Sequence, residues 1–461
     1  MAMGRRQKQG QGQIWLEAKT LAKGPSHPFY RRLNEVLERH GFDAFVEGLA
    51  AKFYAPRLGR PSLPPSVYFR LLLIGYFEGI DSERGIAWRV ADSLALREFL
   101  GLALTDSTPD HSTISRSRRL LELEAHQEAF TWVLTVLAKE GVLRGKTLGI
   151  DATTLEANAA LRSIVRRDTG ENYDEFLRGL AKASGIETPT REDLARLDRK
   201  REKKGSNQDW QNPHDPDAKI TKMKDGRTHL AHKAEHAVDM ETGAVVAVTL
   251  QPADRGDTES LEATLEEAMA ELSDVTEDSE SGEALSDEVL AEIVADKGYH
   301  SNAVLVARAE TGIRTYISEP KRGRRNWAAK AAEKAAVYAN RRRIRGDRGK
   351  QLLRRRGELI ERSFAHCYET GRMRRTHLRG HRNILKRLLV HVAGFNLGLM
   401  MREVFGIGKP RTLQGLRAAL LRLVCAAYIA ICDFLSLPWV FGPTIPSVSS
   451  SYCSMCAFSA E

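Results

Sequence analysis

The sequence predicts a mixed α/β fold, in which a sheet with flanking helices is preceded by an all-helical N-terminal part. Three observations predict it. Short β-prone runs end at Asp151 and Asp296, and a hairpin pattern turns at residues 241–243. The segments between and after these runs have apolar residues at the spacing of a helix. Strands that alternate with helices after a hairpin are typical of a mixed sheet.

Length and composition narrow the class of protein. The chain has 461 residues, enough for roughly two to four domains at about 100–200 residues each. It carries 70 Lys and Arg against 60 Asp and Glu, and this net charge of +10 favours a polyanionic partner such as nucleic acid. The five cysteines are too few for a disulfide framework, and the N-terminus lacks the apolar run of a signal peptide. We expect a cytoplasmic protein.

Residues 1–135 are predicted to form a helical N-terminal domain. Helices are expected over 64–77 and 82–91, because each range begins with helix-opening residues. A turn at 107–110 then opens a short basic helix. Two interpretations of this helix stay open: the DNA-contacting helix of a helix-turn-helix, or a plain bundle helix with arginines in solvent. The candidate DNA contacts are Arg116, Arg118 and Arg119.

Residues 140–405 are predicted to form the α/β domain. Its strands are expected at 147–150, 232–239, 244–250, 293–295 and 314–317. The polar and basic stretch at about 158–229 has no strand pattern and is predicted as a helical insertion.

Residues 406–461 are predicted as a helical extension with a disordered tail. Its longest apolar run, Leu423–Cys432, falls short of the ~20 residues needed to cross a bilayer, so we expect no membrane segment. The tail carries a lone Cys453-x-x-Cys456 pair, without the second ligand pair of a structural zinc site nearby.

Charge is distributed unevenly along the α/β part. Residues 257–292 contain fourteen Asp and Glu and no Lys or Arg, whereas residues 311–390 contain twenty-four Lys and Arg and six acids. The basic block also has apolar residues at helical spacing, so we interpret it as folded and cationic. The acidic helix is expected on the far side of the sheet from any DNA, or as a screen for the basic block.

Two carboxylates define the candidate site. Asp151 and Asp296 each follow a short apolar strand, and neighbouring strands lie about 4.8 Å apart, so both side chains can face one point. Carboxylates that close repel each other unless a cation lies between them. Oxygen ligands without thiolates suit Mg²⁺, and two such ions can catalyse an in-line phosphoryl displacement.

A third carboxylate is expected on the basic helix near residue 360. Glu358 and Glu361 share a helix face there, and spacing alone does not separate them. Each has an alternative interpretation as one half of a helix salt bridge.

Three ordered motifs carry a family resemblance. GIDATTLEAN contains Asp151, IVADKGYHS contains Asp296, and LIERSFAHCYETGRMRRTHLRGHRNILKRLL begins at Leu359. Together with the helical block GRPSLPPSVYFRLLLIGYFEG and the hairpin segment HKAEHAVDMETGAVVAVTLQP, they resemble bacterial insertion-sequence DDE transposases over residues 35–415. The resemblance implies an RNase H-like domain that cuts double-stranded DNA at terminal inverted repeats and joins the freed 3′-hydroxyl to target DNA.

The resemblance also implies the site residues. Asp151, Asp296 and Glu361 would be the catalytic acids and the ligands of Mg²⁺ or Mn²⁺, in two ions, and the enzyme would be a homodimer on DNA. Many relatives have Tyr and Arg shortly before the Glu and a basic residue after it. Here Gly357 and Cys367 stand at such positions. Arg356 and Arg372 are the candidates to replace them as phosphate contacts.

Other candidate DNA contacts follow from residue type. Arg341, Arg342 and Arg343 precede the Glu361 helix and are expected to neutralise phosphates. Tyr299 has two open roles, to stack on an unpaired base or to pack the strand on the next helix.

Two other classes remain as alternatives. An RNase H-like metal-dependent nuclease would use the same acids, and a catalytically inactive DNA-binding regulator would use only the N-terminal helices.

Overall fold

The computed structural model describes residues 27–55, 62–201, 205–223, 226–321 and 323–410 apart from Arg324, together with Met3. The extension predicted at 406–461, with its apolar run and its cysteine pair, lies outside the described residues from 411 onward.

The N-terminal region is helical, as expected. Its helices are α1 (Pro28–Arg39), α2 (Phe42–Ala50), η1 (Ala51–Phe53), α3 (Pro65–Glu78), α4 (Glu83–Ala91), α5 (Leu94–Phe99), α6 (His111–Leu120) and α7 (Leu123–Lys139). Ser82 and Asp110 cap α4 and α6, because each side chain accepts a backbone N–H of the first turn. Helix α3 is buried on all sides rather than along one stripe, because other helices surround it.

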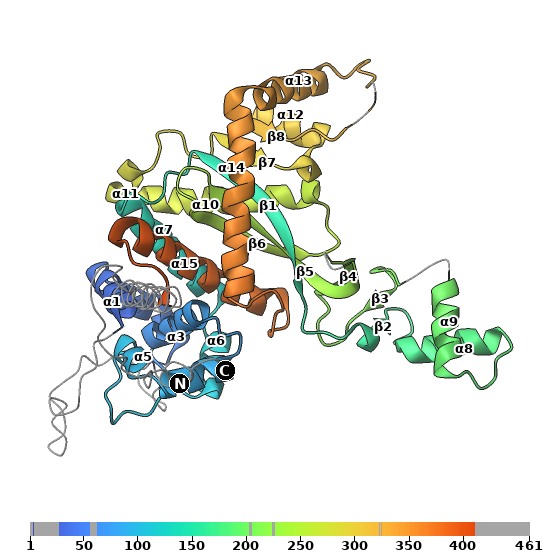
Figure 1. Ribbon diagram of the computed structural model, residues 1–461, viewed down its shortest axis with the longest axis horizontal. Helices are drawn as coiled ribbons and strands as arrows, with labels where there is room; N and C mark the ends of the chain where they lie inside the picture. Colours follow the sequence, from blue (N-terminus) through green and yellow to red (C-terminus); the bar gives the residue numbers. More distant parts are fainter. Residues whose placement is uncertain are drawn as a thin grey trace, which may run out of the picture. The chain divides into compact units, whose positions relative to one another are not determined.

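A mixed six-stranded sheet forms the centre of the α/β part (Figure 1). Its strands are β1 (Thr147–Glu156), β4 (Lys219–Lys222), β5 (Thr228–Asp239), β6 (Val245–Pro252), β7 (Glu292–Ala295) and β8 (Arg314–Ile317). Strands β1, β7 and β8 run parallel, whereas β5 pairs antiparallel with β1 on one side and with β4 and β6 on the other. The predicted mixed sheet with flanking helices is confirmed.

Helices of opposite charge cover the two faces of the sheet. Neighbouring residues of a strand face opposite sides. Glu235 of β5 accepts hydrogen bonds from α10 (Asp257–Glu277), whereas His236 contacts Ser363 of α14 (Asp347–Phe364). The acidic α10 therefore lies on one face and the basic α14 crosses the other, so the acidic helix does not cover the basic one (Figure 1).

The remaining helices follow the strands and close the core. They are α11 (Ser279–Ala284), η3 (Lys297–Tyr299), α12 (Asn302–Glu310), α13 (Ala331–Arg345), the π-helix η4 (Ala365–Thr370) and α15 (His381–Phe405). Helix α15 packs against α3, α7 and β6. Among the described helices it alone is long and apolar enough to cross a membrane, and 94% of its most apolar window is buried inside the protein. Its long apolar stretch is therefore typical of a helix that is buried in the protein core.

The insertion after β1 contains more than helices. It comprises η2 (Leu161–Ser163), β2 (Val165–Arg166), α8 (Tyr173–Ala183), α9 (Arg191–Lys200) and β3 (Trp210–Gln211), and β4 follows. Trp210 forms a small core of its own with Ile164 and Leu230. The expectation that this stretch has no strands was wrong, because strands of two to four residues are too short to show a clear alternation.

Candidate active site

The register of β1 and β7 brings two of the predicted acids together. Ile150 pairs with Ala295 in the last step of this parallel ladder, so Asp151 and Asp296 follow at the same level of adjacent strands. The sequence predicts that β1 ends at Asp151, but β1 continues to Glu156 along β5. Only β7 stops there, and Asp296 begins the short helix η3.

Asp151 has a cationic partner on α14. Its Oδ1 accepts the backbone N–H of Ala152 at 2.9 Å, and its Oδ2 lies 3.0 Å from Nη1 of Arg356. Arg356 also donates to the carbonyl oxygen of Ile150 at 3.2 Å. Burial raises the pKa of Asp151, and the negative charge of Asp296 adds to this rise, whereas Arg356 opposes it. Arg356 is therefore the counter-ion of this carboxylate.

The two carboxylate oxygens of Asp296 have different surroundings. Its Oδ1 accepts the backbone N–H of Gly298 at 2.7 Å, and its Oδ2 has no hydrogen bond within the described ranges. Gly298 is closely packed, because a Cβ built there would lie 2.2 Å from Oδ2 of Asp257. Asp257 is held in turn by Lys233, at 2.6 Å.

Glu361 is exposed on α14 and has no hydrogen bond or ion pair within the part of the chain that the structure describes. Leu359 faces Gly243 in the turn between β5 and β6. At 100° per residue, Glu361 projects from nearly the opposite side of the helix to Leu359. Glu358 is paired with Arg362 at 2.7 Å, which is the helix salt bridge considered above.

The three acids do not form a closed metal centre. Among the described residues, no group of three or more His, Cys, Asp or Glu side chains is arranged to hold a metal ion. The donor set nevertheless fits a hard cation, because two adjacent carboxylates at one end of the sheet carry a charge that only Arg356 offsets.

The candidate DNA contacts have different surroundings. On α6, Arg116 and Arg119 are exposed, whereas Arg118 is mostly buried and forms an ion pair with Glu83. Tyr299 is fully buried and donates to Glu235 at 2.6 Å, so its ring has no exposed face for a base.

The arginines near α13 also differ. Arg341 is paired with Glu319 at 2.7 Å, and Arg343 donates to the carbonyl oxygen of Thr315 at 2.9 Å. Arg342 and Arg372 are exposed, and their side chains have no hydrogen bond or ion pair among the described residues.

Arg374 makes a contact that the sequence does not predict. Its guanidinium donates to Oγ1 of Thr153 at 2.9 Å and to the carbonyl oxygen of Thr154 at 3.1 Å. It therefore contacts the strand of Asp151 two residues further on. Arg374 lies within a run of basic residues, and only the fold distinguishes it from the others.

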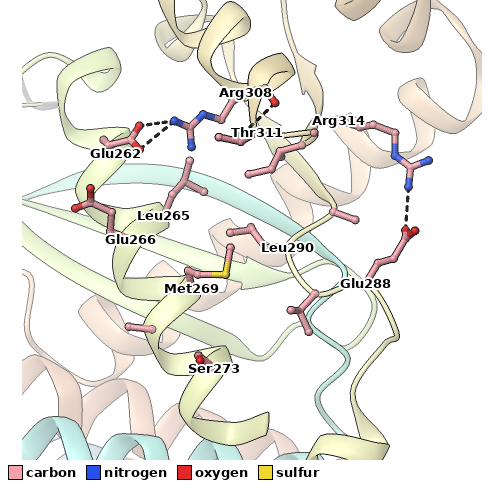
Figure 2. Close-up of a pocket in the computed structure, with 15 residues that line it drawn as sticks. Glu262, Leu265, Glu266, Met269, Ser273, Glu288, Leu290, Arg308, Thr311 and Arg314 are labelled. Carbon is pink, nitrogen blue, oxygen red and sulfur yellow. Dashed lines mark hydrogen bonds and ion pairs between the residues drawn. The ribbon is translucent and has the colours of Figure 1, made fainter.

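A large cavity lies elsewhere. It measures about 980 Å³ and is lined by α10, the end of α12 and the start of β8 (Figure 2). Glu262 and Arg308 form an ion pair across it, and Leu265 and Met269 supply apolar surface. None of the predicted catalytic acids lines this cavity.

Comparison with known families agrees with the two-part architecture. Residues 18–120 match the family described as transposase domain (DUF772), and residues 207–397 match the family described as transposase DDE domain. The second match includes Asp296 and Glu361 and begins after Asp151. A comparison with curated proteins found no match. Both matched domains are transposase domains, so the two matches support the resemblance to insertion-sequence DDE transposases.

Proposed function

We propose that this transposase cuts double-stranded DNA at the terminal inverted repeats of its element and transfers the 3′-hydroxyl ends to target DNA. Asp151, Asp296 and Glu361 are the proposed catalytic acids, on a sheet of RNase H-like type. The N-terminal helices are proposed to bind the DNA ends, and two copies of the chain to act together on them.

The observation that carries the proposal is the pairing of β1 with β7. It aligns Asp151 with Asp296 just beyond the last pair of their parallel ladder, where β7 ends while β1 continues along β5. A basic helix crosses the same face of the sheet, so phosphates and carboxylates can meet there.

The residues around the acids hold them in position. One oxygen of each aspartate accepts a backbone N–H, from Ala152 and Gly298, and this fixes the direction of the other oxygen. The three acids would hold Mg²⁺ or Mn²⁺, proposed as two ions, which activate the attacking oxygen and stabilise the leaving one. For that, Arg356 must leave Asp151, and a DNA phosphate is a suitable new partner for its guanidinium.

Substitution of Asp296 tests the proposal. Asp296→Asn keeps the acceptor for Gly298 and removes the charge. We expect band-shift binding to terminal-repeat DNA to persist while Mg²⁺-dependent cleavage and joining fall by at least about 10³-fold. Asp287→Asn, an exposed acid in the loop before β7, is the control. Full cleavage by Asp296→Asn would refute the assignment of this residue.

The products separate the proposal from its alternatives. A transposase joins a 3′-hydroxyl to a second duplex, whereas a nuclease releases cut DNA only. Wild-type protein that binds DNA but never cuts it with Mg²⁺ or Mn²⁺ would favour a regulator.

A further inference from the structure

A second cavity, of about 330 Å³, lies between the two matched domains. One wall comes from residues 81–84 and from α6, and the other from the loop 372–378 and from α15. The cavity is cationic, because five arginines line it against two acids. The arginines are Arg84, Arg118, Arg372, Arg375 and Arg387.

Both acids of this cavity are already engaged. Glu83 forms its ion pair with Arg118, and Oδ2 of Asp81 lies 3.1 Å from Nε2 of His377. Arg387 is also committed, since it is buried and donates to the carbonyl oxygen of Ile80 at 3.1 Å. The excess positive charge therefore belongs to the exposed side chains from the two walls.

Arg84 and Arg372 carry most of that excess. Each is exposed, and neither side chain has a hydrogen bond or ion pair within the described ranges. Arg375 has only a distant acid, with its Nε 3.8 Å from Oε1 of Glu156. Arginines that converge on one cavity repel each other unless an anion joins them.

The backbone at Arg372 is held in an unfavourable conformation. Its φ of 57° lies in the left-handed region, which residues other than glycine rarely adopt. The π-helix η4 ends just before it, and Met373 N–H donates to the carbonyl oxygen of Tyr368 at 3.0 Å. Such conformations persist where the surrounding structure enforces them, and they concentrate at binding sites.

The loop 372–378 is hydrogen-bonded to β1, the strand that bears Asp151. Glu156 at the end of β1 donates its N–H to the carbonyl oxygen of Arg374 at 2.9 Å and accepts from Thr376 N–H at 2.8 Å. Glu156 follows Asp151 by five residues, or roughly 17 Å at about 3.3 Å per residue. The loop is therefore tied directly to the strand that bears Asp151.

We infer that this cavity binds a DNA backbone phosphate, through Arg84 of the N-terminal domain and Arg372 of the DDE domain. The inference rests on the proposed function for the position of the DNA. Phosphate is the anion that suits it, because guanidinium groups bind phosphate oxygens through paired N–H donors. One phosphate would thus link the domain that binds DNA to the domain that cuts it.

The salt dependence of binding tests the inference. Full-length protein is titrated with a fluorescein-labelled 30-base-pair duplex ending in the element's terminal repeat, at several salt concentrations. Log K falls as log salt rises, and loss of one phosphate contact decreases the steepness of this fall by about 0.9. We expect this decrease for Arg372→Gly, which removes the charge but suits the left-handed backbone, and for Arg84→Gln.

The double variant and a matched control make the test specific. If both arginines bind one phosphate, Arg84→Gln with Arg372→Gly should lower the slope by less than the two single decreases together. Arg314→Gln removes an exposed arginine from the other cavity and should leave the slope unchanged. Unchanged slopes in Arg84→Gln and Arg372→Gly would overturn the inference, as would an equal decrease in Arg314→Gln.

Neutral phosphates locate the contact. A single methylphosphonate is placed at each position of the cleaved strand in turn, and we expect at least one position that weakens wild-type binding but does not weaken Arg372→Gly further. Cleavage by the wild type without this pattern overturns the phosphate site alone. The salt effect without any cleavage supports the site and contradicts the proposed function.

Discussion

Asp151 and Arg356 form the central contact of the candidate site. The carboxylate is largely buried beside a second aspartate, so the guanidinium supplies the positive charge that stabilises it without metal. This arrangement opposes metal binding at Asp151, because a bound cation and Arg356 would compete for the same oxygen.

Arg356→Gln should therefore change the response to metal. We expect a lower Tm without metal, by a few degrees for a loss of ~1 kcal/mol, and a larger rise of Tm with millimolar Mg²⁺ than in wild type. Thermal melts with and without Mg²⁺ measure both. Arg355→Gln, one residue away and bonded to the carbonyl oxygen of Glu241, is the control. An equal Mg²⁺ response in both variants would contradict this role.

Glu271 is a buried carboxylate between α10 and α7. Burial raises its pKa to about 8, and Glu267, Asp274 and Glu128 add to the rise, whereas the hydrogen bond from Thr131 opposes it. The folded state thus favours protonated Glu271. Its contribution to stability is complete below its ordinary pKa of 4.5 and is lost as pH rises toward about 8.

Glu271→Gln should remove this pH dependence. We expect its Tm to exceed that of wild type by at least ~3 °C at pH 8 and the difference to shrink toward pH 5, because the amide stays neutral throughout. Melts at pH 5, 6, 7 and 8 give the profile. Glu266→Gln, an exposed acid on the same helix, should follow wild type. A Tm difference that is constant with pH would refute the titration.

At the scale of elements, asparagines of two helices bind the outer strands of the sheet. Asn396 of α15 accepts from Val245 N–H at 2.9 Å and donates to its carbonyl oxygen at 2.8 Å. Asn340 of α13 makes the same pair of bonds to Ile317 of β8, at 3.0 and 2.8 Å. Each amide continues the hydrogen bonding of a strand that lacks a further neighbour at that residue, and so closes a sheet edge.

Substitution of Asn396 should show how much this edge contact contributes to the stability of the protein. Asn396→Ala leaves a buried N–H and a buried carbonyl without partners, so we expect a loss of about 2–4 kcal/mol in the free energy of unfolding. Urea unfolding monitored by circular dichroism measures it. Asn383→Ala on the same helix loses only a bond to the carbonyl oxygen of Arg379 near solvent and should cost under ~1 kcal/mol. Similar costs for both would show that the edge contact contributes little.

At the scale of the whole molecule, charge is separated across the sheet. The acidic α10 covers one face and the basic α14 crosses the other. The net charge of +10 is therefore small because opposite charges on the two sides of the sheet largely cancel. A polyanion is thereby directed to the face that bears Asp151 and Asp296. The acidic side carries the large cavity instead.

Helix α15 joins the N-terminal helices to the sheet, and it approaches α3 closely at Gly394. A Cβ built there would lie 2.5 Å from Cδ1 of the buried Tyr76. Gly394→Ala should therefore cost about 1–3 kcal/mol through overpacking. Chemical denaturation measures the cost, which should shrink in a Tyr76→Leu background.

Gly357→Ala provides the comparison for that substitution. A Cβ at Gly357 meets nothing within 4 Å, so alanine should be neutral or stabilising there, by up to ~1 kcal/mol. A harmless Gly394→Ala would mean that the two helices can separate without loss of stability.

The sequence by itself determined the mixed α/β class, the five main strands of the sheet, both aspartates and the transposase family. These depend on local patterns: apolar runs, turn residues and ordered motifs. The length of β1 beyond Asp151 was missed, because its pairing with β5 depends on residues about 80 positions away. The two-residue strands of the insertion were missed because they have no pattern to detect.

Only the tertiary structure decided which charges meet. It paired Arg356 with Asp151, buried Tyr299 against Glu235, and gathered Arg84 and Arg372 at one cavity from opposite ends of the chain. One arginine in a basic run resembles the next in sequence. The physical reason is that electrostatic partners are fixed by distance in space, and the fold alone sets that distance.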